Sequence, residues 1–212
     1  MNDIKLNFSK TNDELYGQSK WWGAPDLPED WDYPCVSIDD ETEIPLTFIC
    51  QIRCSDIAKY DTKNLLPHEG MLYFFAALGE YMENQEDFCE EHEYYNGIGE
   101  WSNEAFKVLY APSTNNLSSY EILYDDGSPT FLPAEALTFG KDDESTYWLL
   151  GGTLDPEVGE QFQDYINLLQ VDENPEYWGL CLYDMGTLNF LIKPKDLMER
   201  KFDKALVYFQ SC

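Results

Sequence analysis

The chain has 212 residues, with 41 acidic against 13 basic side chains and a formal net charge of −28 at neutral pH. Its hydrophobic content of 43%, which includes the 16% aromatic residues, excludes wholesale disorder despite that charge. The acidity disfavours nucleic acid, anionic membranes and other polyanions as partners, because phosphate binding needs clustered cations.

The N-terminal part predicts two strands separated by a long irregular loop. Ile4, Leu6 and Phe8 alternate with polar residues, which indicates a strand of period two. Three tryptophans, three prolines and a glycine within residues 21–34 exclude a helix there and favour a loop held by buried tryptophans. A strand over 46–52 is expected after Pro45.

The middle of the chain is less regular. Ser55 predicts the N-cap of one helical turn over 56–60. Residues 71–78 are apolar on both faces, which predicts a central strand. The stretch 80–104 carries nine carboxylates and no Lys or Arg, and its conformation stays open between a helix with an acidic face and a mobile excursion.

The C-terminal half again predicts mainly strands. Asp155 as N-cap and Pro156 in the first turn indicate a short helix over 156–165. The other expected elements are strands over 106–111, 119–124 and 166–171, a hairpin of 179–183 with 187–192, a helix from Pro194 to Arg200, and a last strand around Leu206 and Tyr208.

Two segments have nearly the same pattern. One strand ends on Gln51 and is followed, nineteen residues later, by Gly70-Met71-Leu72-Tyr73-Phe74; another ends on Gln170 and is followed, sixteen residues later, by Gly186-Thr187-Leu188-Asn189-Phe190. No linker separates them, so we predict a single domain over 1–212 with pseudo-repeat halves at about 20–111 and 119–212. The expected fold class is α+β and β-rich, with mixed, largely antiparallel sheets, an internal pseudo-duplication and a few short helices.

Several short motifs follow one another in a defined order. They are Trp22-Gly23-Ala24-Pro25-Asp26-Leu27-Pro28, Pro45-Leu46-Thr47-Phe48-Ile49-Cys50-Gln51-Ile52, Gly70-Met71-Leu72-Tyr73-Phe74-Phe75, Leu149-Leu150-Gly151-Gly152, Leu168-Leu169-Gln170-Val171-Asp172 and Asp184-Met185-Gly186. Their order and spacing over roughly residues 20–212 resemble the YwqG-like family, which implies a mixed α/β fold with largely antiparallel sheets. The chain departs from the family in the stretch 80–104 and at Gly152, where the resemblance leads us to expect Tyr followed by Pro. The family has no known function, so the resemblance implies no reaction, substrate or cofactor.

Recognisable catalytic and metal-binding motifs are missing from the sequence. His68 and His92 are the only histidines, and the spacing of Cys89 and His92 lacks the second ligand pair that a zinc site needs. There is no nucleophile elbow, phosphate-binding loop or dinucleotide-binding turn. A two-carboxylate hydrolase remains possible in composition, but 41 acidic residues single out no pair. We therefore predict no catalytic residue, no metal site and no cofactor.

The compartment is predicted from what the sequence lacks. No apolar run is long enough to cross a bilayer, and the first residues carry no export signal, so we expect a soluble cytoplasmic protein. In a reducing compartment most of the scattered cysteines should be free thiols that pack as small hydrophobes. They are Cys35, Cys50, Cys54, Cys89, Cys181 and Cys212.

Gln51, Gln170, Trp22 and Trp31 are the candidate ligand-binding residues. A glutamine that ends an apolar strand is costly to bury unless its amide finds partners. The two glutamines either line a cleft between the repeats and orient a small polar ligand, or they tie the Trp-Gly-Ala-Pro loop and the Leu-Leu-Gly-Gly turn to the sheet. The tryptophans form either an aromatic wall for a peptide or sugar, or a satellite core.

Two hypotheses for function follow. In the first, the chain is a soluble acidic interaction or regulatory protein that binds a basic partner protein without catalysis, since a strongly acidic surface attracts cations. In the second, it is a small-ligand binder or hydrolase that uses a cleft between the two repeats. A third interpretation gives the acidic surface no role beyond solubility. The sequence leaves the oligomeric state undetermined.

Overall fold

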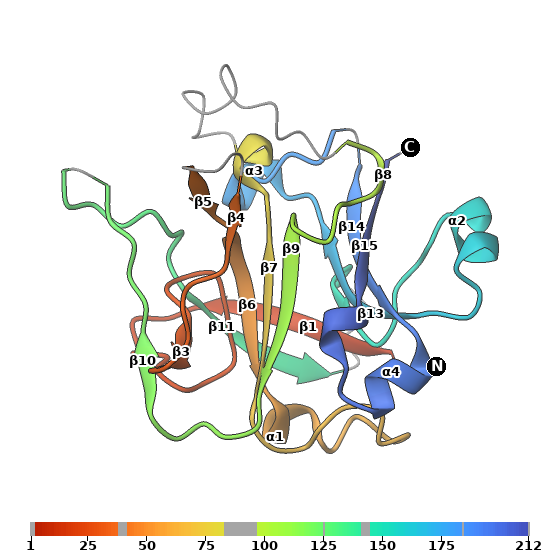
Figure 1. The fold of residues 1–212 in the computed structure, drawn as a ribbon, viewed down its shortest axis with the longest axis horizontal. Coiled ribbons are helices and arrows are strands. Elements are labelled where there is room, and N and C mark those ends of the chain that lie inside the picture. Colours follow the sequence, from red (N-terminus) through yellow and green to blue (C-terminus); the bar gives the residue numbers. More distant parts are fainter. Residues whose placement is uncertain are drawn as a thin grey trace.

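The fold is built on one sheet of eleven strands whose pairings are all antiparallel (Figure 1). This computed structural model describes residues 3–37, 42–82, 97–124, 126–140, 145–183 and 185–211. The strand order is β8 (Gly99–Glu100), β15 (Leu206–Gln210), β14 (Thr187–Ile192), β13 (Ile166–Asp172), β12 (Trp148–Leu149), β1 (Ile4–Lys10), β11 (Glu135–Gly140), β2 (Lys20–Trp21), β6 (Thr47–Arg53), β7 (Met71–Ala76) and β9 (Phe106–Ala111). The predicted β-rich fold class with antiparallel sheets is confirmed.

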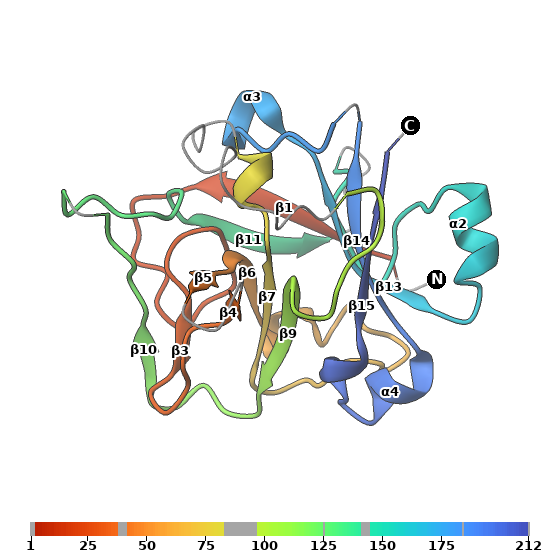
Figure 2. The ribbon, with the colours of Figure 1, turned by 45° about the horizontal axis from the view of Figure 1, so that its top comes forward.

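Smaller elements cover this sheet. Two additional two-stranded sheets join β3 (Asp26–Pro28) to β10 (Leu117–Ser119) and β4 (Cys35–Ser37) to β5 (Glu43–Pro45). The helices are α1 (Cys54–Ile57), α2 (Pro156–Gln161), α3 (Pro175–Trp178) and α4 (Pro194–Met198), with 3-10 turns η1 (Gly79–Tyr81) and η2 (Phe202–Lys204). The sheet is curled: β1 and β11 run across the molecule, whereas β7, β9, β14 and β15 run nearly upright (Figures 1 and 2).

An internal two-fold relation organises the large sheet. The first half, which we define as β1, β2, β6, β7 and β9, is repeated in order by a second half of β11, β12, β13, β14 and β15. At the centre β1 pairs with β11, and the Leu-x-Phe sequence of each strand meets that of the other, since Leu6 pairs with Phe139 and Phe8 with Leu137. The structural repeat therefore includes β1 and β11, beyond the segments whose sequence motifs match.

The two halves also exchange strands. β1 of the first half pairs with β12 of the second, and β11 of the second half pairs with β2 of the first. Across the inside of the curled sheet, the ring of Phe74 on β7 contacts that of Phe190 on β14, with centroids 5.5 Å apart. Each half thus completes its part of the sheet only with a strand from the other.

The duplication extends to an irregularity of the strands. The register of β6 against β7 shifts between Phe48 and Cys50, and that of β13 against β14 shifts between Asn167 and Leu169. In each case one extra residue is inserted, as in a β-bulge, and bulges re-aim the side chains that follow them. Gln51 and Gln170 follow the two bulges at the same distance, so the two glutamines occupy equivalent positions.

Several expected elements differ from those found. The first helix has Arg53 rather than Ser55 at its N-cap, because β6 continues directly into α1. The strand predicted over 119–124 lies instead at Leu117–Ser119, where it pairs with β3. The hairpin of 179–183 with 187–192 is wrong, since β14 pairs with β13 and β15. The cap at Asp155 is confirmed: its carboxylate accepts a hydrogen bond from Glu157 N at 2.9 Å.

Candidate functional site

Gln51 ties the loop after β2 to the sheet. Its side chain is fully buried. The amide oxygen Oε1 accepts a hydrogen bond from Asp26 N at 2.8 Å, and Nε2 donates to Gln18 O at 2.9 Å and to Asp26 Oδ2 at 2.7 Å. Both N–H groups of the amide therefore donate a hydrogen bond, and its oxygen accepts one. We call this set of contacts the first clamp.

Gln170 makes the equivalent contacts in the second half. Its Oε1 accepts from Thr153 N at 2.8 Å, and its Nε2 donates to Thr146 O at 3.1 Å and to Asp172 Oδ1 at 2.9 Å. Each glutamine therefore binds one backbone N–H, one backbone carbonyl and one carboxylate. We call this set the second clamp. The hydrogen bonds are those expected if the glutamines tie neighbouring loops to the sheet, and a role in ligand binding stays a prediction.

The loops held by the clamps have matching backbones. Trp22 and Leu150 both adopt positive φ, at 55° and 58°. Trp22 N donates to Ile49 O at 2.8 Å, and Leu150 N donates to Leu168 O at 3.0 Å. Both acceptors are the extra residues of the two bulges. The bulge, the left-handed residue and the glutamine therefore form one repeated device that fixes where each loop leaves the sheet.

Gly152, where the resemblance led us to expect Tyr, lies against the amide of Gln170. Its φ is +110°, and a Cβ at this position would lie 2.1 Å from Gln170 Oε1. No side chain fits so close to the amide, because real Cβ contacts are much longer and this φ is strained for L-residues. The turn therefore depends on glycine for the second clamp to close.

The carboxylates of the two clamps have different partners. In the first clamp Asp26 Oδ2 also accepts from Gly17 N at 2.9 Å and forms a buried ion pair with Lys20 Nζ at 2.9 Å. In the second clamp Asp172 accepts a hydrogen bond from the Thr187 hydroxyl at 3.2 Å. Burial raises the pKa of Asp172, and hydrogen bonds from Thr146, Gln170 and Thr187 offset part of that shift.

The two candidate tryptophans lie in different cores. Trp22 is 2% exposed and belongs to the main core, where its ring lies 5.7 Å from those of Trp21 and Trp178. Trp31 is half-buried and packs at the margin of a second cluster, with its ring 6.0 Å from that of Tyr73. The structure brings neither of them next to both glutamines.

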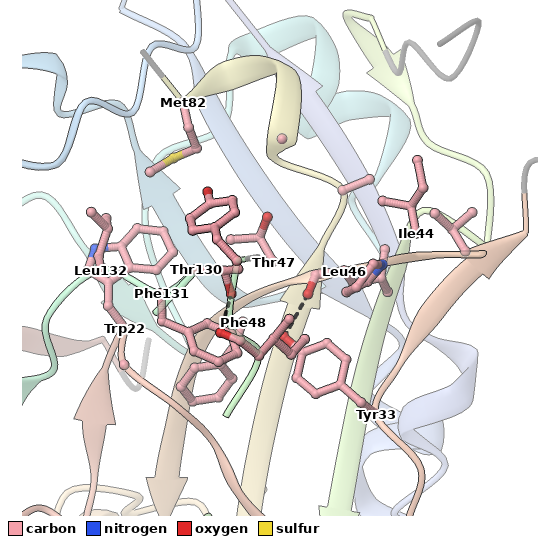
Figure 3. Close-up of a pocket in the computed structure, with 17 residues that line it drawn as sticks. Trp22, Tyr33, Ile44, Leu46, Thr47, Phe48, Met82, Thr130, Phe131 and Leu132 are labelled. Atoms are coloured by element: carbon pink, nitrogen blue, oxygen red, sulfur yellow. Dashed lines mark hydrogen bonds between the residues drawn. The ribbon is translucent and has the colours of Figure 1, made fainter. Parts of the chain in front are cut away.

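An apolar pocket of about 190 Å³ lies over the second cluster (Figure 3). Five aromatic side chains line it: Trp22, Tyr33, Phe48, Tyr124 and Phe131. The other lining residues include Ile44 and Leu46 from the β5–β6 segment, Met82 after η1, and Thr130 and Leu132 before β11. In Figure 3, Trp22 and Leu132 stand on one side of the pocket and Ile44 and Tyr33 on the other, with Met82 above.

Two hydroxyl groups of the pocket wall are engaged within the protein. The Tyr33 hydroxyl donates to Leu46 O at 2.8 Å, and the Thr130 hydroxyl donates to Ile122 O at 3.0 Å (Figure 3). Burial raises the pKa of Tyr33 above its ordinary value, so that side chain is neutral at physiological pH. The pocket wall consists mainly of ring faces and aliphatic groups, which suit an apolar group of a ligand, while Trp22 Nε1 has no hydrogen-bond partner among the described residues.

The family can now be assigned. A family model described as a domain of unknown function (DUF1963) matches residues 19–148 and 138–212. The chain belongs to this family. The resemblance to YwqG-like proteins is therefore confirmed, and no curated protein matches the chain. Because the family is defined without a function, membership supports the fold and leaves the ligand of the pocket open.

Trp22 is the one candidate ligand-binding residue from the sequence that lines the pocket. Trp22 was a candidate, whereas Tyr33, Phe48 and Phe131 were not, because they come from segments far apart in the chain. A usable signal was present in residues 120–131, where aromatic residues recur between polar ones in a segment without a core strand. Gln51, Gln170 and Trp31 are not among the residues that line the pocket.

Other predictions concern metals and membranes. In the described ranges, no group of three or more His, Cys, Asp or Glu side chains is arranged to hold a metal ion. Cys89, His92 and most of the stretch 80–104 lie outside the described residues. Among the helices that the structure describes, none is long and apolar enough to cross a bilayer.

Proposed function

We propose that the protein is a binding protein whose pocket receives an apolar, ring-sized group of a positively charged partner. The observation that carries the proposal is the aromatic pocket together with the charge of the segments that form it. Segments 22–48, 77–82 and 122–132 contain no Lys or Arg and eleven Asp or Glu. An acidic environment raises the local concentration of cations and disfavours anions.

The size of the pocket defines the group that enters it. A cavity of about 150 Å³ lined by aliphatic and aromatic side chains is enough to bind benzene. The volume of about 190 Å³ found here therefore accommodates one aromatic ring or one large aliphatic side chain. Its five aromatic walls also favour a cationic group close to the ring, because the faces of aromatic rings attract positive charge.

The lining residues support binding in preference to catalysis. The side chains that the structure describes around the pocket include no His, Cys, Lys, Asp or Glu. General acid–base catalysis and covalent catalysis use such a group, or a Ser, Thr or Tyr hydroxyl, within hydrogen-bond reach of the reacting atoms. The hydroxyls of Tyr33 and Thr130 are already donated to backbone carbonyls.

The proposal is tested with three small probes that share one ring and differ in charge: benzyltrimethylammonium, benzyl alcohol and phenylacetate. Their affinities are measured by NMR titration at low and high salt. We expect the cation to bind about tenfold more tightly than the anion at low salt, a difference of roughly 1.4 kcal/mol. Salt should reduce this difference, since it screens the attraction.

A pocket-filling variant locates the binding. Ala77 lines the pocket and is half-buried, so Ala77→Phe places a ring in the space that the ligand needs. Thr138→Phe is the matched control, because Thr138 is exposed on β11 away from the lining residues. Binding that survives in Ala77→Phe, or three probes that fail to bind the wild type, would contradict the proposal.

A further inference from the structure

The pocket opens beside an exposed apolar rim, which we define as Tyr120, Leu123 and Tyr124. These side chains are 40%, 52% and 46% exposed. Tyr124 lines the pocket, and the ring of Tyr120 lies 5.1 Å from that of Tyr33, which also lines it. Through Tyr120 and Tyr124 the rim therefore continues the apolar surface of the pocket beyond the area that a single ring-sized group can cover.

Backbone hydrogen bonds hold the rim in place. Thr130 N donates to Ile122 O at 3.0 Å, and Tyr124 N donates to Ser128 O at 2.8 Å. Tyr120 N donates to Pro25 O at 2.8 Å, in the loop that the first clamp fixes. The exposed side chains thus project from a backbone with defined geometry, which lowers the conformational entropy lost on binding.

We propose that the occupant of this surface is a basic polypeptide segment, with one large apolar side chain in the pocket and lysine or arginine residues on either side. This inference rests on the proposed function and names its partner class. Exposed tyrosines beside an apolar pocket resemble the centre of a protein–protein interface, where aromatic residues are enriched and a buried anchor supplies most of the affinity. The absence of Lys and Arg from the lining segments complements flanking cations on the partner.

The competing occupant is a small organic cation that fills only the pocket. Such a ligand would leave Tyr120 and Leu123 uncovered, because neither belongs to the pocket lining. A polypeptide would cover them. The two occupants therefore differ in whether the rim contributes to affinity, and Tyr120 and Leu123 can be changed without altering a residue that lines the pocket.

The experiment compares three seven-residue peptides by isothermal titration calorimetry. One has tryptophan at the centre and lysine at four flanking positions, the second has alanine at the centre, and the third has glutamate in place of lysine. We expect the tryptophan peptide to bind at least about tenfold more tightly than the alanine peptide, because truncating an anchor residue typically costs that much affinity. The glutamate peptide should bind too weakly to measure.

The double variant Tyr120→Ser/Leu123→Ser separates the two proposals. We expect it to weaken the tryptophan peptide about tenfold while benzyltrimethylammonium binds within twofold of the wild type. If the probe binds but the tryptophan and alanine peptides bind equally, or the rim variant keeps full peptide affinity, the peptide inference is wrong and the proposed function stands. If neither probe nor peptide binds, both are wrong.

Discussion

The two clamps solve the same problem with different charges. In both, a glutamine after a bulge binds one N–H, one carbonyl and one carboxylate. In the first, the carboxylate belongs to Asp26 of the clamped loop and pairs with buried Lys20. In the second, it belongs to Asp172 on the same strand as Gln170, with the Thr187 hydroxyl as a further donor. The amide is thus common to both halves, while the charge arrangement is not.

This difference shows what the duplicated fold requires. Each clamp uses two donors and one acceptor of a single side chain, and among neutral side chains only the amides of Gln and Asn offer two N–H donors beside an acceptor oxygen. The charged partners are free to differ, because any acceptor can take the second amide N–H. The first clamp also holds the loop that contains the pocket residue Trp22. Because the first clamp includes a buried ion pair, we expect substitutions in it to destabilise the protein more than substitutions in the second clamp.

The largest effect is expected for Lys20→Met. This change leaves Asp26 buried without its cation, and breaking a buried pair from one side typically costs about 3–5 kcal/mol. Asp26 Oδ1 already lacks a hydrogen-bond partner among the described residues, so no donor on that oxygen compensates for the lost cation. Urea denaturation measures the free energy of unfolding. The exposed Lys195→Met is the control, and the double variant Lys20→Met/Asp26→Asn should recover part of the loss.

The next effect compares the two glutamines directly. Gln51→Leu removes the hydrogen-bond partner of Gln18 O and of the buried Asp26 N, so we expect a loss of about 3 kcal/mol. Gln170→Leu should cost about 2 kcal/mol, because its loop lies closer to solvent. The exposed Gln161→Leu on α2 should change stability by less than about 0.5 kcal/mol. Equal and small losses at 51 and 170 would contradict the clamp interpretation.

Gly152→Ala tests the backbone of the second clamp. The added Cβ would lie 2.1 Å from Gln170 Oε1, so the amide or the turn must move. We expect a loss of about 2 kcal/mol, from strain at positive φ and a weakened hydrogen bond to Thr153 N. Gly127→Ala is the control, since Gly127 also has positive φ but no atom lies within 4 Å of the added Cβ. The two variants should differ by the steric contribution alone.

Sequence patterns predicted the parts of this fold that depend on local order. The apolar run 71–78 and the repeated Gln and Gly-x-Leu-x-Phe motifs gave β7, β14 and the equivalence of the glutamines. The central pairing of β1 with β11 could not be predicted, because it joins strands more than 120 residues apart and Leu-x-Phe alone is too short a signal. The pocket was missed for the same reason, since Tyr33, Phe48 and Phe131 converge only in the folded chain.

The smallest expected effect is a pH dependence of stability that arises from Asp172 in the second clamp. Burial raises the pKa of Asp172, so the native state takes up a proton more readily there than the unfolded chain, whose carboxyl keeps a pKa of about 3.9. As pH rises through this interval, ionisation of Asp172 in the native state lowers the free energy of unfolding. Asp172→Asn removes that titration and keeps an acceptor for the Gln170 and Thr187 donors.

The stability of Asp172→Asn relative to the wild type should therefore increase as pH rises from about 4 to 7. Urea midpoints across this range measure the difference. Asp164→Asn, on an exposed residue, controls for the removal of one negative charge from an acidic chain. A difference that stays constant with pH would mean that hydrogen bonds from Gln170 and Thr187 fully offset the burial of Asp172. The second clamp would then hold its carboxylate as well without a cation as the first does with Lys20.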